Sequence, residues 1–301
     1  MDKKIIKLIE EKGPLIGSEI WKIVAGDGLT LWRSCKMSKN LIIRTIGTKY
    51  LRLDPRVDGF ARLSPSIFRE FLTYSIIGIP GDPDSLERRV RDQISHIEEV
   101  SKEKLELAYR SISSLVSSFE SEWIPDYQAC FIIAGDIVYN MGHDMPRPER
   151  STGKLVNGSD MDLVVIVDDQ FPGDLMKRLD DAIYKEKYRL LMTPHIREEI
   201  DYVIKKVARV REQVRFDVFK HMVACKILRE GTLLYGSEDL FGAVKVMLKE
   251  MNVPEKLNVL EKRARYFRKD AEDYLLFYDT KEVKERRAYF FYPTEESEEF
   301  E

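Results

Sequence analysis

The sequence predicts a mixed α/β (α+β) protein of several domains, in which helices surround small β-sheets. The chain has 301 residues, which is longer than the commonest single domain. Apolar residues recur at helical spacing through much of it, while two short runs, 129–134 and 161–167, are almost wholly apolar and are typical of buried strands. We therefore expect separate helical and sheet-containing units.

The N-terminal part predicts three short helices, at 3–11, 18–24 and 30–38. Two β-rich runs follow, 41–45 and 49–53, and Gly47 between them favours a hairpin turn. Three helices and a hairpin are typical of a winged-helix domain, which we assign to residues 1–80. A further helix, predicted over 64–79, packs on this domain.

The rest of the chain divides at its turn residues and by its periodicity. Beyond residue 80 we expect a helical linker over 81–124 and a mixed β-sheet domain with flanking helices over 125–240. A C-terminal helical region over 241–294 and an acidic tail over 295–301 follow. Within the sheet domain the predicted strands are 129–134, 161–167 and 214–219, and the predicted helices are 175–191 and 196–210. Residues from 221 to about 279 are predicted to be almost wholly helical.

Composition excludes several classes of protein. No apolar run approaches the ~18 residues of a membrane span, and the N-terminus lacks the apolar core of a signal peptide, so we expect a cytoplasmic protein. Cys35, Cys130 and Cys225 lie far apart and predict buried free thiols. Neither they nor the four histidines have the spacing of zinc ligands. The sequence leaves the oligomeric state open, a homo-oligomer included.

The charge is uneven although the net charge is only −3. Residues 1–60 hold twelve Lys or Arg against seven Asp or Glu, which suggests a polyanionic partner such as RNA or DNA. The candidate phosphate-binding residues are Arg33, Lys36 and Lys39 on the third helix and Lys49 and Arg52 on the wing. Docking of a protein partner is the alternative role for such a domain.

Two aspartates, Asp160 and Asp162, stand at the start of the apolar strand 161–167. Residues two apart on a strand point to the same side, so both carboxylates face one point in space. Hard cations such as Mg²⁺ or Mn²⁺ prefer such oxygen ligands. The alternative is a solvated strand entrance, since Asp after Ser is common in turns.

A third carboxylate on a neighbouring strand would complete a two-metal site for phosphoryl transfer. Asp217, in the predicted strand 214–219, is our candidate. Asp201 is the rival if residues 199–207 form a strand, although the helical spacing of apolar residues there argues against it. Gly135, at the end of the strand 129–134, would let the backbone approach phosphates closely.

These residues also carry a resemblance. The strand ending at Gly135, the run Ser159-Asp160-Met161-Asp162, and Asp217 followed by the helix Ile227–Gly236 with its Leu-Arg-Glu-Gly phrase resemble the nucleotidyltransferase superfamily with the DNA polymerase β-like fold, small prokaryotic branch. The resemblance covers about residues 125–240. The chain departs from the family pattern in two places: Asp136 stands where a serine or glycine is usual, and the loop 140–157 is longer than usual.

The resemblance implies a metal-dependent enzyme that moves a nucleoside monophosphate from a triphosphate such as ATP to a hydroxyl of RNA, protein or a small molecule. Its catalytic and metal-binding residues would be Asp160, Asp162 and Asp217, and its nucleotide-binding residues Gly135, Asp136, Ser159 and Lys154. The winged helix would bind the acceptor or nucleic acid. The alternative is a non-catalytic regulator whose transferase-like domain senses a nucleotide, which the replacement of serine by Asp136 favours.

Overall fold

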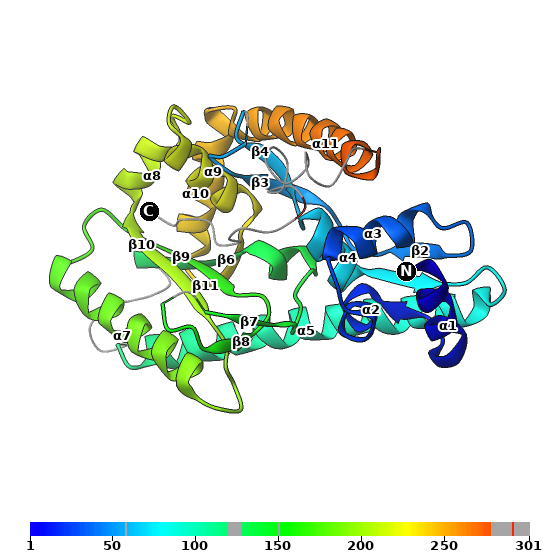
Figure 1. Ribbon diagram of the computed structural model, residues 1–301. Coiled ribbons are helices and arrows are strands. Elements are labelled where there is room, and N and C mark those ends of the chain that lie inside the picture. Colours follow the sequence, from blue (N-terminus) through cyan, green and yellow to red (C-terminus); the bar gives the residue numbers. More distant parts are fainter. Residues whose placement is uncertain (58, 120–127, 150, 278–290, 292–301) are drawn as a thin grey trace. The chain divides into compact units, whose positions relative to one another are not determined.

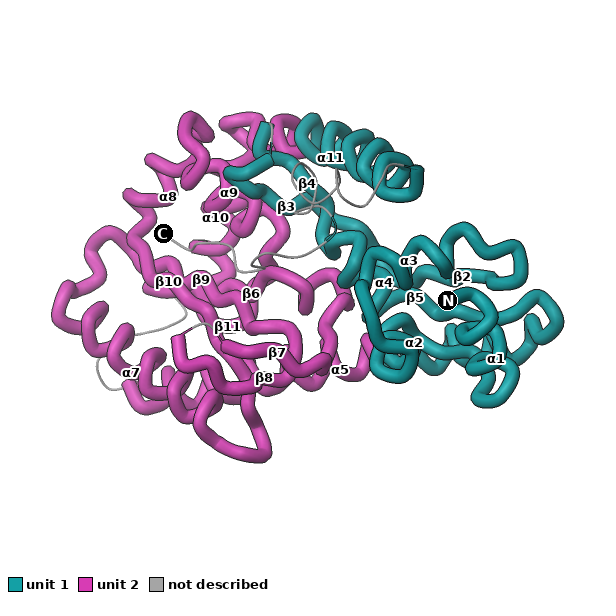
Figure 2. Tube along the Cα trace, in the orientation of Figure 1, with its two compact units in different colours: residues 1–96, 258–297 teal, residues 97–257, 298–301 magenta. Residues whose placement is uncertain are grey.

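The computed structural model describes the chain except for residues 58, 120–127, 150, 278–290 and 292–301 (Figure 1). Helices and several small sheets confirm the mixed α/β class. The chain divides into two compact units, residues 1–96 with 258–297 and residues 97–257 with 298–301 (Figure 2). The predicted acidic tail, 295–301, lies outside the described residues.

The first unit begins with the three predicted helices, α1 (Asp2–Lys12), α2 (Gly17–Val24) and α3 (Gly28–Met37). Asp27 caps α3, because its carboxylate accepts the backbone N–H of Thr30 at 2.9 Å. The helices accompany an antiparallel sheet of β1 (Leu15–Ile16), β5 (Ser75–Gly78) and β2 (Ile42–Thr45), in the order β1-β5-β2.

The predicted hairpin between 41–45 and 49–53 is wrong. β3 (Tyr50–Leu53) pairs with β4 (Ala61–Ser64), and β2 pairs with β5. The predicted helix over 64–79 is correspondingly shorter, since α4 spans only Ile67–Tyr74. Ile76 and Ile77 are fully buried, which a central strand between two partners allows.

Two long helices connect the units along the chain. α5 (Pro83–Ser117) is continuous through most of the predicted linker, and the first unit ends inside it at residue 96. α11 (Val253–Phe277) crosses back after residue 257. The compact units thus divide the chain within helices, whereas the sequence suggested a break at the Gly-Pro turn near residue 80.

The second unit is built on a four-stranded sheet in the order β10-β9-β6-β11. Its strands are β6 (Ala129–Ala134), β9 (Met161–Val167), β10 (Ile200–Lys206) and β11 (Thr232–Gly236). β9 and β10 are parallel, and the other pairs are antiparallel. The loop between β6 and β9 contains the 3₁₀ helix η1 (Gly135–Tyr139) and the hairpin of β7 (Pro146–Pro148) and β8 (Leu155–Asn157).

The two faces of this sheet are covered by different helices (Figure 1). Alternate residues of β9, Met161, Leu163, Val165 and Val167, pack against α5 and α7 (Gly173–Met192) in the main core. The other face packs against α8 (Val207–Gln213), α9 (Phe219–Glu230) and α10 (Glu238–Glu250). Because Asp160 and Asp162 have the opposite parity to Met161, they belong to the second face.

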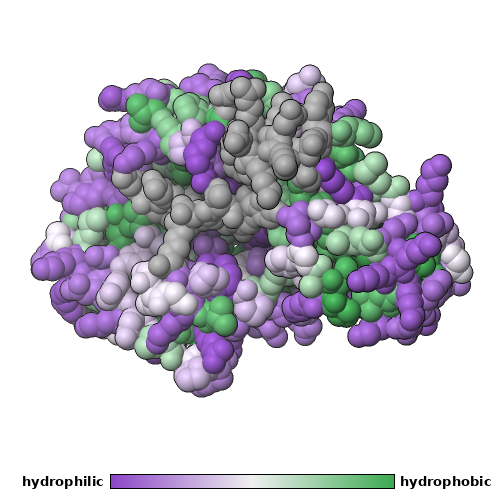
Figure 3. Space-filling view, in the orientation of Figure 1, coloured by the Kyte–Doolittle hydropathy of each residue, from purple (hydrophilic) through white to green (hydrophobic). Residues whose placement is uncertain are grey.

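The surface and the thiols agree with the composition. The described residues visible in Figure 3 are mostly hydrophilic, as expected when 34% of residues are charged. Among the described helices, none combines the length and the apolar character that a membrane crossing requires. All three cysteines are free and buried, as predicted, and burial raises the pKa of each thiol to about 12.

Candidate metal centre

Three chain segments meet at one end of the four-stranded sheet. Antiparallel pairing sets Ala134, the last residue of β6, opposite Asp162 near the start of β9. Parallel pairing sets Asp162 opposite Asp201 near the start of β10. The sheet topology alone therefore brings the turn after β6 and the entrances of β9 and β10 to the same place.

Three carboxylates converge there. Asp160, Asp162 and Asp201 each offer one oxygen, and these oxygens lie within 4.8 Å of one another. Asp201 points to the same face as Asp162, because paired residues of parallel strands project to the same side. All three side chains are half-buried, so a cation between them would be only partly exposed to water.

Asp217, the third carboxylate that the sequence predicted, does not join this group. Residues 214–218 form no strand and connect α8 to α9. The exposed carboxylate of Asp217 lies 2.6 Å from Nδ1 of His221, and this hydrogen bond holds the pKa of Asp217 below its ordinary value. The rival, Asp201, takes the place because residues 200–206 form β10 and not a helix.

Gly135 approaches the carboxylates more closely than any other residue type could. Its φ of 75° lies in the left-handed region, and a Cβ at this position would overlap Oδ2 of Asp162. The backbone after β6 thus lies directly against the carboxylate of Asp162. This agrees with the predicted place of Gly135 at the site.

Side chains of α9 contact the turn that begins at Gly135. Glu230, at the end of α9, accepts the hydroxyl of Tyr139 at 2.8 Å and lies 3.4 Å from the backbone nitrogen of Gly135. Lys226, one turn earlier on α9, donates to the same carboxylate at 2.8 Å, and both side chains are buried. The turn and α9 are therefore joined by a buried ion pair.

Asp136 and Ser159 lie at the same corner. The hydroxyl of Ser159 donates to Asp136 at 2.7 Å and accepts the backbone N–H of His143 at 3.2 Å. The negative charge of Asp136 helps to raise the pKa of Asp160. Asp136 is thus an additional carboxylate near the group.

Two cations partly neutralise the group. Arg147, on β7, lies 2.8 Å from Glu199 and 3.5 Å from Asp160, and its Nε donates to the carbonyl of Gly158 at 2.7 Å. Lys187, on α7, donates to Asp201 at 2.7 Å. The guanidinium therefore binds the carboxylates from the loop that the sequence marked as unusually long.

Negative charge still dominates the site. Burial raises the pKa of Asp160, Arg147 opposes the rise, and Asp201 and Asp136 add to it. Burial likewise raises the pKa of Glu199 to about 7, with Arg147 again opposing and Asp201 and Asp160 reinforcing the shift. These carboxylates therefore oppose one another's ionisation, and a divalent cation would bind them in their ionised form.

The structure does not bring Lys154 to the carboxylates. Its exposed side chain extends from the loop before β8, and its ammonium lies 3.0 Å from the sulfur of Met192. Of the four residues predicted to bind nucleotide, Gly135, Asp136 and Ser159 are at the site and Lys154 is elsewhere on the second unit.

The basic residues predicted to bind nucleic acid have different environments. Lys36 and Lys39 are exposed at the end of α3. Arg33 donates from Nε to the carbonyl of Leu275, and Arg52 is buried. Lys49 pairs with the buried Glu70 at 2.8 Å. Three of the five side chains are thus engaged or buried inside the first unit.

The sequence missed several residues of this site. Glu199 and Lys187 gave no local signal, because their partners Arg147 and Asp201 lie on other elements. Glu230 stood in the Leu-Arg-Glu-Gly phrase, but the phrase did not indicate its contact with the turn after β6. Asp201, which the sequence offered only as the rival of Asp217, could have been preferred from the run Ile200–Lys206, where β-branched residues and Tyr202 favour a strand. Arg147 was visible only as one of several basic residues in a long loop.

Comparisons with protein-family models, with curated proteins and with solved structures find no match for this chain.

Proposed function

We propose that the second unit is a Mg²⁺-dependent nucleotidyltransferase that moves a nucleoside monophosphate from a nucleoside triphosphate to a hydroxyl. The observation that carries the proposal is the convergence of Asp160, Asp162 and Asp201 within 4.8 Å at neighbouring strand entrances. Mixed sheets with carboxylates placed in this way suit two-metal phosphoryl transfer, and Mn²⁺ fits the same oxygen ligands. Asp201 takes the role that the sequence gave to Asp217.

The surrounding residues suit an anionic substrate once cations are bound. Mg²⁺ on the three aspartates would neutralise the phosphates and make the acceptor hydroxyl easier to deprotonate. Because Gly135 has no side chain, its backbone lies directly against Oδ2 of Asp162, and a phosphate bound to a cation at Asp162 would lie close to that backbone. Arg147, already at the carboxylates, would supply a planar donor for phosphate oxygens.

The first unit supports the winged-helix part of the proposal in a modified form. Helices α1–α3 and the sheet order β1-β5-β2 suit a winged helix in which β2 and β5 take the place of the predicted hairpin strands. The wing would then be the long connection that contains β3, β4 and α4. For an acceptor or nucleic acid, Lys36 and Lys39 are the exposed candidates.

The test is transfer of label from each α-labelled nucleoside triphosphate, with Mg²⁺, to mixed cellular RNA or protein. Asp160→Asn, Asp162→Asn and Asp201→Asn are each expected to reduce transfer by more than about 100-fold, because even the residues that support metal ligands contribute about 10–100-fold. Asp217→Asn is the matched control and should retain activity. Nucleotide binding without transfer would instead favour the nucleotide-sensing regulator, and loss with Asp217→Asn alone would contradict the assignment.

A further inference from the structure

One nitrogen of Arg147 lies between two carboxylates of the candidate metal centre. Its Nη2 atom is 2.8 Å from Glu199 and 3.5 Å from Asp160. A guanidinium stays protonated in proteins, so a permanent positive charge bridges this pair. Divalent ions bridge carboxylates in the same way in two-metal sites, where the two ions lie about 3.5–4 Å apart. The guanidinium thus has the charge and the bridging contacts of a second cation.

The hairpin of β7 and β8 holds Arg147 in this place. Pro146 and Pro148 flank it, and each fixes its own backbone φ. Arg147 also pairs with the buried Val156 of β8. Its Nε donates to the carbonyl of Gly158 at 2.7 Å. The contact with the two carboxylates is therefore built into the loop between β6 and β9.

The contact between Arg147 and Glu199 can nevertheless be exchanged for better ones. Nη2 of Arg147 and Oε2 of Glu199 are both shielded from water, yet neither has a hydrogen-bond partner within the described part of the chain, because their ion pair lacks the alignment of a hydrogen bond. Buried polar atoms without hydrogen bonds are costly. Both atoms would gain a better partner if Glu199 bound a cation and the guanidinium donated to phosphate oxygens, which it can do with two parallel hydrogen bonds.

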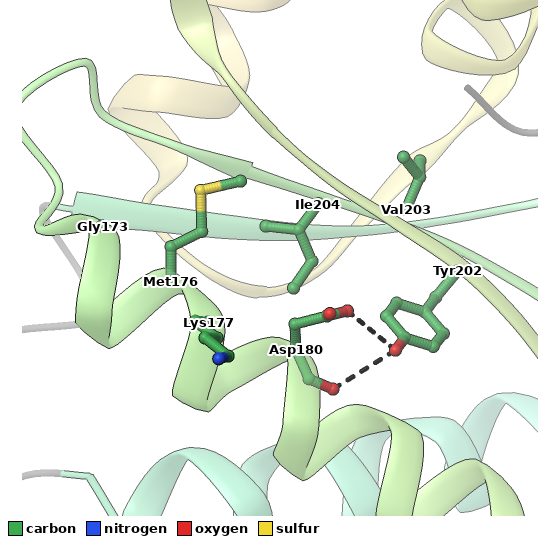
Figure 4. A pocket seen from close by; sticks show the side chains of 7 residues that line it. All are labelled: Gly173, Met176, Lys177, Asp180, Tyr202, Val203 and Ile204. Carbon is green, nitrogen blue, oxygen red and sulfur yellow. Dashed lines mark hydrogen bonds between the residues drawn. The ribbon is translucent and has the colours of Figure 1, made fainter.

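The other cation at the centre, Lys187, contacts the carboxylates differently. Figure 4 shows Tyr202 directed toward α7, beside a hollow of about 640 Å³, and Val203 directed to the opposite side. Asp201 has the parity of Val203, so its carboxylate points away from this hollow. Lys187 of α7 pairs with Asp201 at 2.7 Å. Lys187 therefore neutralises one aspartate, whereas Arg147 bridges two carboxylates, and this difference makes Lys187 a matched control.

We propose that Arg147 acts as the second cation of this centre, so that the three aspartates bind a single divalent ion until a metal-bound triphosphate arrives. This inference rests on the proposed function, which assigns the carboxylates to metal binding. When such a substrate binds, the guanidinium would move from Glu199 and Asp160 to a phosphate oxygen and leave the two carboxylates to the cation of the substrate. Arg147 thus keeps the centre partly neutralised before the substrate binds.

Counting the bound Mn²⁺ ions tests the proposal without any measurement of activity. Calorimetric titration in the absence of nucleotide should give one ion per chain in the wild type and two in Arg147→Met. Two ions about 3.5–4 Å apart couple magnetically, so the electron paramagnetic resonance spectrum of this variant should be broadened. Arg147→Lys keeps the positive charge and should keep a single ion. Lys187→Met removes a charge from one aspartate only and should also bind a single ion.

Each other result has a definite meaning. Two ions in the wild type, or one ion in Arg147→Met that circular dichroism shows to be folded, would overturn the proposal and leave the transferase assignment intact. Two ions in Lys187→Met would overturn it as well, because the count would then follow the total charge and not the bridging position. The wild type and Arg147→Lys decide the question if Arg147→Met does not fold, since two ions in either would overturn the proposal. No bound Mn²⁺ in the wild type or any variant would overturn the metal centre itself.

Discussion

At the scale of single residues, a missing side chain shapes the candidate metal centre. Gly135→Ala would strain the left-handed backbone and push against Oδ2 of Asp162. We expect the affinity for Mn²⁺ to fall by about 10–100-fold, as when other residues that orient metal ligands are changed. Titration calorimetry or electron paramagnetic resonance of Mn²⁺ would measure the change.

Gly153 offers a matched control for this substitution. Its φ of 68° is close to the 75° of Gly135, but a Cβ there meets nothing within 4 Å. Gly153→Ala therefore imposes the same kind of backbone strain without the overlap, and should leave Mn²⁺ affinity near that of wild type. If the two variants lose affinity equally, the contact with Asp162 is not the cause.

Residue identities at the site were predictable where the signal was local. Asp160 and Asp162 followed from the two-residue period of a strand, and Gly135 from its place after an apolar run. Arg147 and Glu199 meet across about fifty residues of chain, and no spacing rule links them. Such partners depend on how the strands pair, which the sequence alone leaves open.

At the scale of elements, β10 shows why the third carboxylate was misassigned. Apolar residues at 200, 203, 204 and 207 fit a helical period, but a short strand can have the same sequence of apolar residues, so the pattern does not distinguish the two. Pairing with β9 along its whole length decides the outcome. Short apolar runs are ambiguous in this way, whereas the longer, amphipathic α7 and the flanked strands β6 and β9 were predicted correctly.

The connection between η1 and α9 gives a prediction at the same scale. Glu230 and Lys226 form a buried ion pair that supports the turn after Gly135. Glu230→Gln should destabilise the protein by about 3–5 kcal/mol, because it leaves the charge of Lys226 buried without its carboxylate. Urea unfolding would measure the loss.

The double variant Glu230→Gln/Lys226→Met separates the lost charge pair from lost packing. Removing both charges relieves the buried cation, so the double variant should be more stable than Glu230→Gln alone. If the losses of stability in Glu230→Gln and in Lys226→Met simply add up in the double variant, the ion pair contributes little and packing alone holds α9 against the turn.

At the scale of the whole molecule, the two units separate in a way that the sequence did not indicate. The first unit combines segments distant in the chain, since most residues of α11 belong to it. A glycine- and proline-rich turn near residue 80 suggested a boundary, whereas the first compact unit continues past this turn into α5 and ends at residue 96. Glycine and proline in the sequence indicate turns. The limits of a compact unit depend instead on which helices pack together, and this involves residues far apart in the chain.

Metal binding should stabilise one unit selectively. The carboxylates of Asp136, Asp160, Asp162, Glu199 and Asp201 repel one another in the second unit, and a divalent cation that binds only the folded state removes part of this repulsion. At 100 times Kd the gain is about 2.7 kcal/mol, which corresponds to roughly 5–10 °C in Tm for a unit of this size. In calorimetry, Mn²⁺ should therefore raise the unfolding temperature of the second unit and leave that of the first unit unchanged.

Two variants and a salt control test this shift. Asp162→Asn should abolish the shift, Asp217→Asn should retain it, and potassium chloride at matched ionic strength should not reproduce it. An equal shift in Asp162→Asn would place the bound cation elsewhere on the protein.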